Sequence, residues 1–120
     1  SSASLGTYIQ SHKTTSASES FNFVIDIVIS NLNHSIAILR HGKTSLYKNK
    51  DINKEKLTFH FEELKRKNFS RLENDNELDE NARESKMQEA QLVIEQLIWM
   101  TDLSDKILTI TKEFIAKNPD

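Results

Sequence analysis

Residues 90–115 read AQLVIEQLIWMTDLSDKILTITKEFI, and this stretch decides the fold. One set of its residues recurs at alternating spacings of four and three, which places them on one face of an α-helix. The set comprises Ala90, Ile94, Leu97, Thr101, Ser104, Leu108, Thr111 and Ile115. Four more apolar residues widen this stripe, namely Val93, Met100, Ile107 and Phe114. We therefore predict one long helix, from about Leu78 to Ala116, whose stripe faces the core.

The stretch from Phe21 to Leu39 is open to two interpretations. Its first half alternates apolar and other residues, as β-strands do, at Phe21, Phe23, Ile25, Ile27 and Ile29. It also carries an apolar stripe at helical spacing, comprising Phe21, Ile25, Val28, Leu32, Ile36 and Leu39. We choose a helix because this stripe continues where the alternation stops. In addition, Ser16 and Glu19 form a capping-box pattern, and Gly42 is a suitable C-terminal stop.

The remaining segments complete an all-α fold. A helix from about Ile52 to Leu72 is expected to pack with Leu57, Phe61, Leu64 and Leu72. Residues 73–81 are expected to form an acidic loop, and residues 1–20 a Ser- and Thr-rich lead-in. Within this lead-in, Leu5, Tyr8 and Ile9 have the spacing of a short helix. The 120 residues contain only two glycines and one proline, which disfavours a fold with many tight turns. We predict a single domain, residues 1–120: an antiparallel helical bundle of three main helices, with a fourth short one at the N-terminus.

Charge is distributed unevenly along the chain. Residues 40–71 contain ten basic and four acidic side chains, a net charge of +6, whereas residues 72–105 contain ten acidic and two basic, a net charge of −8. In the simplest interpretation the two segments are neighbours that attract each other. Alternatively, Lys65, Arg66, Lys67 and Arg71 contact an anionic lipid surface. Nucleic acid is not expected as a partner, because the net charge is −2 and no recognition motif is present.

No set of residues required for catalysis is assembled in the sequence. There are no cysteines, which excludes thiolate metal sites and cysteine nucleophiles. Phosphate-binding loops need several glycines at close spacing, and the two glycines lie far apart. The histidines lack metal-binding spacing and are expected at the surface or its boundary: His12, His34, His41 and His60. We therefore expect no enzyme, no metal and no cofactor.

The centre of the long helix holds the candidate partner-contacting residues. Trp99 and Met100 belong to an apolar pattern and are expected to pack in the core. Thr101 and Ser104 are polar positions on the same stripe, which can bond back to the helix or mark a face that meets a partner. As the alternative to core packing, Trp99, Met100, Thr101 and Ser104 are the candidate residues for contact with a partner.

Three stretches taken together resemble a known family. They are residues 5–13, LGTYIQSHK; residues 22–39, ending NLNHSIAIL; and residues 59–117, containing FHFEELKRK and QLIWMTDLSDKI. Their order resembles the C-terminal cytoplasmic helical region of fusaric-acid-resistance-like inner-membrane proteins of bacteria, which look like exporters. That family has membrane helices, whereas here the longest apolar stretch is interrupted by Asn22 and Asp26. The resemblance, together with a start at Ser1 and not at Met, implies an excised soluble piece.

Three functions remain open at this point. The resemblance implies a non-catalytic cytoplasmic domain at the inner membrane, part of an export protein, which acts in assembly or regulation. Its partner would be the chain itself or the rest of that membrane protein. The alternatives are a free-standing helical interaction module, adaptor or chaperone-like, and a ligand-sensing helical bundle of a receptor.

Overall fold

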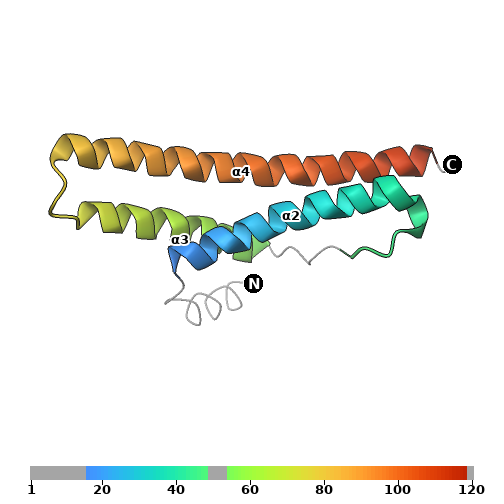
Figure 1. Cartoon of the computed structure of the whole chain (residues 1–120), viewed down its shortest axis with the longest axis horizontal. Helices are drawn as coiled ribbons and strands as arrows, with labels where there is room; N and C mark the ends of the chain where they lie inside the picture. Colours follow the sequence, from blue (N-terminus) through green and yellow to red (C-terminus); the bar gives the residue numbers. More distant parts are fainter. Residues whose placement is uncertain (1–15, 49–53, 119–120) are drawn as a thin grey trace.

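The computed structural model describes residues 16–48 and 54–118, which form three long helices (Figure 1). Helix α2 spans Ala17–His41, α3 spans Lys54–Glu73 and α4 spans Glu80–Lys117. A single 3₁₀ turn, η1, spans Gly42–Thr44. Helices α2 and α4 run parallel, and α3 runs antiparallel to both. The predicted all-α bundle of three main helices is confirmed, while Leu5, Tyr8 and Ile9 of the predicted short helix lie outside the described residues.

The ends of α2 are formed by the residues predicted for them. The Ser16 hydroxyl accepts a hydrogen bond from the Glu19 backbone N–H at 3.1 Å, so it satisfies one of the free donors in the first turn. Gly42 has φ +57°, a left-handed conformation that side chains rarely tolerate, and it stops the helix. Helix, and not strand, is therefore correct for residues 21–39.

The turn between α3 and α4 is organised by one arginine that the sequence analysis did not single out. Helix α4 begins after Asp79, whose carboxylate accepts from the Ala82 N–H at 2.7 Å. The Arg83 guanidinium donates to the backbone carbonyls of Leu72, Asp75 and Leu78, at 3.0, 2.8 and 3.2 Å. The last carbonyls of a helix have no partner within it, so Arg83 caps α3 and fixes the turn to α4.

The apolar core lies where all three helices meet. Val24 of α2, Leu64 of α3, and Ile94 and Leu97 of α4 form one buried cluster. The predicted α4 stripe is confirmed at its six central members, which are buried: Ile94, Leu97, Thr101, Ser104, Leu108 and Thr111. The prediction that Val93, Met100 and Phe114 widen its buried side is wrong, because these three residues are exposed.

The α2 stripe predicted for the core is wrong in its orientation. Of its six residues only Val28 is buried, whereas Phe21, Leu32, Ile36 and Leu39 are exposed. A polar set faces the interior in their place, comprising Ser20, Asn31 and Ser35. The physical reason lies in the contact between α2 and α4, described below.

Helix α3 covers only the first half of this pair. Its first residue, Lys54, lines a cleft together with Asp105 of α4 and Asn31 of α2. Beyond that level α2 and α4 continue side by side to the far end of the molecule (Figure 1). Within the described residues, only η1 and the segment after it accompany this second half.

Candidate interaction surface

Small polar side chains contribute to the contact between α2 and α4, beside buried apolar residues such as Ile38 and Leu108. The Asn31 Nδ2 donates to the Ser104 Oγ at 3.1 Å, and the Ser104 hydroxyl donates to the Thr101 carbonyl at 2.9 Å. Ser35 donates to the Asn31 carbonyl at 2.9 Å. Asn31 is fully buried and Ser104 is 2 % exposed. Small residues let two helices approach closely, and every hydroxyl in this contact has a partner, so the polar contact is compatible with burial.

A second polar contact joins α2 to α3. The Ser20 Oγ lies 2.9 Å from the Nδ1 of His60, and both residues are buried. The His60 ring stacks between Phe23 and Phe59, with ring centroids 4.1 and 5.1 Å apart. The expectation that His60 lies at the surface is therefore wrong. The sequence signal that could have placed it is its position between Phe59 and Phe61.

Large apolar side chains line the outside of both α2 and α4. We define the apolar face as twelve residues that are 37–62 % exposed. On α2 they are Phe21, Ile29, Leu32, Ile36 and Leu39. On α4 they are Leu92, Val93, Trp99, Met100, Leu103, Ile110 and Phe114.

The candidate partner-contacting residues divide between the surface and the interior. Trp99 is 58 % exposed and Met100 is 37 % exposed, so the expectation that they pack in the core is wrong. Thr101 and Ser104 point into the α2–α4 contact, where Thr101 donates to the Leu97 carbonyl at 2.8 Å. These two hydroxyls bond back to their own helix, which was one of the two roles considered for them.

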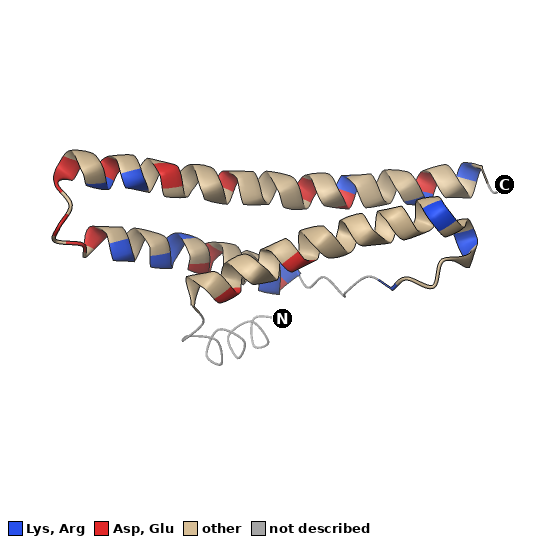
Figure 2. Cartoon of the chain, in the orientation of Figure 1, with Lys and Arg blue, Asp and Glu red and all other residues tan. Residues whose placement is uncertain are grey.

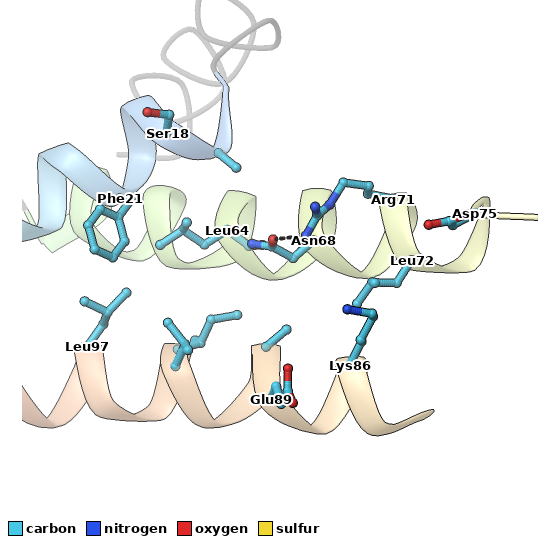
Figure 3. A pocket seen from close by; sticks show the side chains of 14 residues that line it. Ser18, Phe21, Leu64, Asn68, Arg71, Leu72, Asp75, Lys86, Glu89 and Leu97 are labelled. Carbon is cyan, nitrogen blue, oxygen red and sulfur yellow. Dashed lines mark hydrogen bonds between the residues drawn. The ribbon is translucent and has the colours of Figure 1, made fainter. Parts of the chain in front are cut away.

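The apolar residues of α2 and α4 lie on the same side of the helix pair, away from α3. Phe21 points toward α4, where it lines a cleft together with Val93 and Leu97 (Figure 3). Leu32 lies eleven residues after Phe21, about three turns, and Met100 lies seven residues after Val93, about two turns. Leu32 therefore points in about the same direction as Phe21, and Met100 points in about the same direction as Val93. The apolar face is thus continuous from one helix to the other.

The apolar face is larger than the exposed patches of ordinary monomers. Since each of its side chains is about half exposed, and a large side chain offers roughly 150–200 Å², the face presents on the order of 1,000 Å². The largest patch on a typical monomer is about 300–600 Å². In Figure 2 most of α2 shows few charged residues, in agreement with this distribution.

Tyr47, in the segment after η1, packs on the side of the α2–α4 pair opposite the apolar face. The Tyr47 hydroxyl donates to the Ser30 carbonyl at 3.3 Å, and the Tyr47 ring lies 5.2 Å from that of His34. The Nδ1 of His34 is buried and has no hydrogen-bond partner. Burial, assisted by the positive charge of Lys112, lowers the pKa of His34 below its ordinary value. The neutral form of the imidazole is therefore favoured.

A cleft of about 500 Å³ opens where α2 begins and where α3 and α4 approach their connecting turn. Its floor is apolar, with Leu64, Leu72 and Ile94 among its residues. Its rim carries both signs of charge, from Arg71, Asp75, Lys86 and Glu89 (Figure 3). Because these charges balance, the rim does not select a ligand by charge.

The four basic residues predicted to contact an anionic surface lie along α3, and two of them are paired within it. Arg66 donates to Glu63 at 2.8 Å and Lys67 lies 3.6 Å from the same carboxylate. Arg71 donates to Asn68 at 3.2 Å, and Lys65 is exposed. The basic segment lies beside the acidic first half of α4, as the simpler interpretation expects. The ion pairs Arg66–Glu63, Lys67–Glu63 and Arg83–Glu80 nevertheless each lie within a single helix.

No protein-family model, curated protein or solved structure matches this chain. Residues Ala17–Thr44 are long and apolar enough to cross a membrane by length and composition alone, although the sequence analysis found no such span. The mostly buried core helix of a soluble protein and a signal sequence pass the same criterion; here 39 % of the apolar window is buried, and α2 packs on both other helices. Within the described residues no group of three His, Asp or Glu side chains could hold a metal ion.

Proposed function

We propose that this chain is a helical protein-interaction module that binds its partner through the apolar face of α2 and α4. One observation carries the proposal: twelve large apolar residues of α2 and α4 stay exposed, although small polar residues occupy part of the buried α2–α4 contact. Exposing so much apolar surface to water is unfavourable, at about 25 cal/mol for each Å². A partner that covers the face removes this cost.

The face also has the composition of a protein interface. Aromatic residues and methionine are enriched in such interfaces, and charged residues are depleted at their centres. Trp99, Met100 and Phe114 provide large contact areas, and none of the twelve residues is charged. Assembly through helix packing is the role that the resemblance to an export-protein domain also implies, so the proposal holds whether the module is free-standing or part of a longer protein.

Trp99 makes the proposal testable, because it is the only tryptophan and lies within the face. The full chain would be diluted until sedimentation shows a monomer, and the quenching of its fluorescence by acrylamide would be measured. We expect strong quenching together with binding of an apolar dye, and we expect Leu103→Glu to reduce dye binding. A monomer whose Trp99 is shielded and which binds no dye would refute the proposal.

A further inference from the structure

We propose that the partner on the apolar face is a second copy of this chain, related to the first by a two-fold axis near Leu103. This inference rests on the proposed function and adds the identity of the partner. It is carried by three features: the symmetry of the exposed positions, the area that they offer, and the charges beside them.

The exposed stripe of α4 is symmetric about Leu103. Counting outward from Leu103, apolar or uncharged residues recur at four, seven and eleven positions on both sides. The stripe comprises Leu92, Gln96, Trp99, Leu103, Ile107, Ile110 and Phe114. A second α4 laid antiparallel across Leu103 would therefore place Leu92 beside the second copy's Phe114, and Trp99 beside its Ile107.

The exposed stripe of α2 is centred on about the same level, although Ile36 has no exposed counterpart because position 24 is the buried Val24. Its outermost residues, Phe21 and Leu39, are centred on position 30, and Ile29 and Leu32 lie close to that centre on either side. The hydrogen bond between Asn31 and Ser104 joins residues 73 positions apart on parallel helices. Position 30 of α2 is therefore level with position 103 of α4. One two-fold axis perpendicular to the helices maps the α4 stripe onto itself and exchanges Phe21 and Leu39 of α2, as a self-complementary dimer interface requires.

The area and length of the face fit a second copy. A stable interface needs about 800 Å² from each partner, and the face offers on the order of 1,000 Å². From Leu92 to Phe114 the face is roughly 33 Å long at 1.5 Å for each residue. A helix of fifteen residues, the number that precede Ser16, would span only about 22 Å, which is shorter than the face. Two α2–α4 pairs packed face to face would also supply the four helices of a bundle core. Within one copy α3 covers only the first half of the pair, so it does not complete such a core.

The charges beside the face favour a protein over a lipid surface. The flank of α4 carries Glu95, Asp102, Lys106 and Glu113, all exposed. Three of these four side chains are acidic, so they repel anionic head groups. A bilayer would also have to accept these charges at the depth of the apolar residues, whereas in a dimer they remain at the wet rim of the interface.

Sedimentation equilibrium of the full chain tests the proposal over a wide range of concentrations. We expect a mass of twice 13.9 kDa at high concentration. Ile110→Glu is expected to raise the dissociation constant roughly 100-fold or more, because each copy would then bury an unpaired charge. Ile110 is 62 % exposed in the single chain, so this substitution leaves the fold intact, which circular dichroism would check. Thr109→Glu, on the neighbouring exposed residue away from the face, is the matched control and should leave the dimer unchanged.

The absence of cysteine allows a direct test of the axis. Leu103→Cys should form an intermolecular disulfide under mild oxidation, because residues on a two-fold axis approach their own copies. Thr109→Cys should not. A dimer that survives Ile110→Glu, or that cross-links equally well through both cysteines, would overturn the inference.

Other outcomes separate this inference from the proposed function. A monomer at every concentration that leaves Trp99 open to acrylamide overturns the dimer but keeps the interaction module, which then binds a different protein. If the chain is a monomer whose Trp99 is shielded, and deletion of residues 1–15 opens Trp99 to acrylamide, both the dimer and the interaction module are overturned. A monomer that sediments with phosphatidylcholine vesicles and thereby shields Trp99 also overturns both, in favour of a membrane.

Discussion

Removal of the Arg83 side chain is expected to destabilise the whole bundle. Its guanidinium makes three hydrogen bonds to backbone carbonyls at the end of α3 and in the following turn, and its side chain is only 17 % exposed. A hydrogen bond to a charged group contributes about 1.5–3 kcal/mol when measured alone. Because the three bonds share one donor group and two of the carbonyls lie in a turn that can be rehydrated, we expect Arg83→Ala to cost about 2–4 kcal/mol in total.

Urea unfolding followed by circular dichroism would measure this loss, and a thermal scan should show a fall of roughly 5–15 °C in the melting temperature. Arg83→Lys should recover little of it, since an ammonium group cannot reach three carbonyls in the way a planar guanidinium does. Arg66→Ala is the control, because Arg66 pairs with Glu63 on the surface and its side chain is 59 % exposed. If Arg83→Ala cost no more than Arg66→Ala, the capping role assigned to Arg83 would be wrong. Because a dimer depends on concentration, all variants should be compared at one chain concentration.

Three further predictions concern the polar interior, the buried imidazole and the end of α2. Ser104→Ala should lower the free energy of unfolding by about 1–3 kcal/mol, because one N–H of the buried Asn31 amide loses its acceptor. The double change Ser104→Ala with Asn31→Leu should cost less than the sum of the two single changes. Strict additivity in urea unfolding would contradict the assigned hydrogen bond. His34 has a lowered pKa when folded, so the unfolded chain binds the proton more readily, and stability should fall as the pH drops below the ordinary pKa of 6.5. His34→Phe should remove this part of the pH dependence, and an unchanged pH profile would contradict the burial assigned to the ring. Gly42→Ala should cost about 1 kcal/mol through its left-handed backbone alone, since a Cβ there would meet nothing within 4 Å; an unchanged melting temperature would show that η1 rearranges freely.

The sequence predicted the helices well because the signals for them are local. The hydroxyl of Ser16, the backbone freedom of Gly42 and the 4-3 spacing from Ile94 to Thr111 each act within one or two turns of chain. The observed helices begin and end within about four residues of the predicted positions. The α4 stripe was also oriented correctly, including its polar members Thr101 and Ser104, because no competing stripe has such regular spacing.

The candidate surface was predicted only in part. Trp99 and Met100 were selected as residues that meet a partner, and both lie on the apolar face. The α2 half of that face was assigned to the core, because apolar periodicity was taken to mark the buried side. Arg83 was missed because its three acceptors are backbone carbonyls, which no residue pattern reveals.

The sequence by itself determined where the helices lie, where α2 and α4 begin and end, and which side of α4 is buried, because hydrogen bonds and side chains within a few residues control these properties. Only the tertiary structure decided which side of α2 faces inward. Helix α2 has large apolar residues on one side and a mixture of aliphatic and small polar residues, such as Ile27 and Asn31, on another, and either side could be buried in a suitable partner. The choice depends on Asn31 meeting Ser104, a residue 73 positions away, and on the close approach that small side chains allow. That choice turns the large apolar residues of α2 outward beside those of α4, and so creates the surface through which we propose the chain assembles.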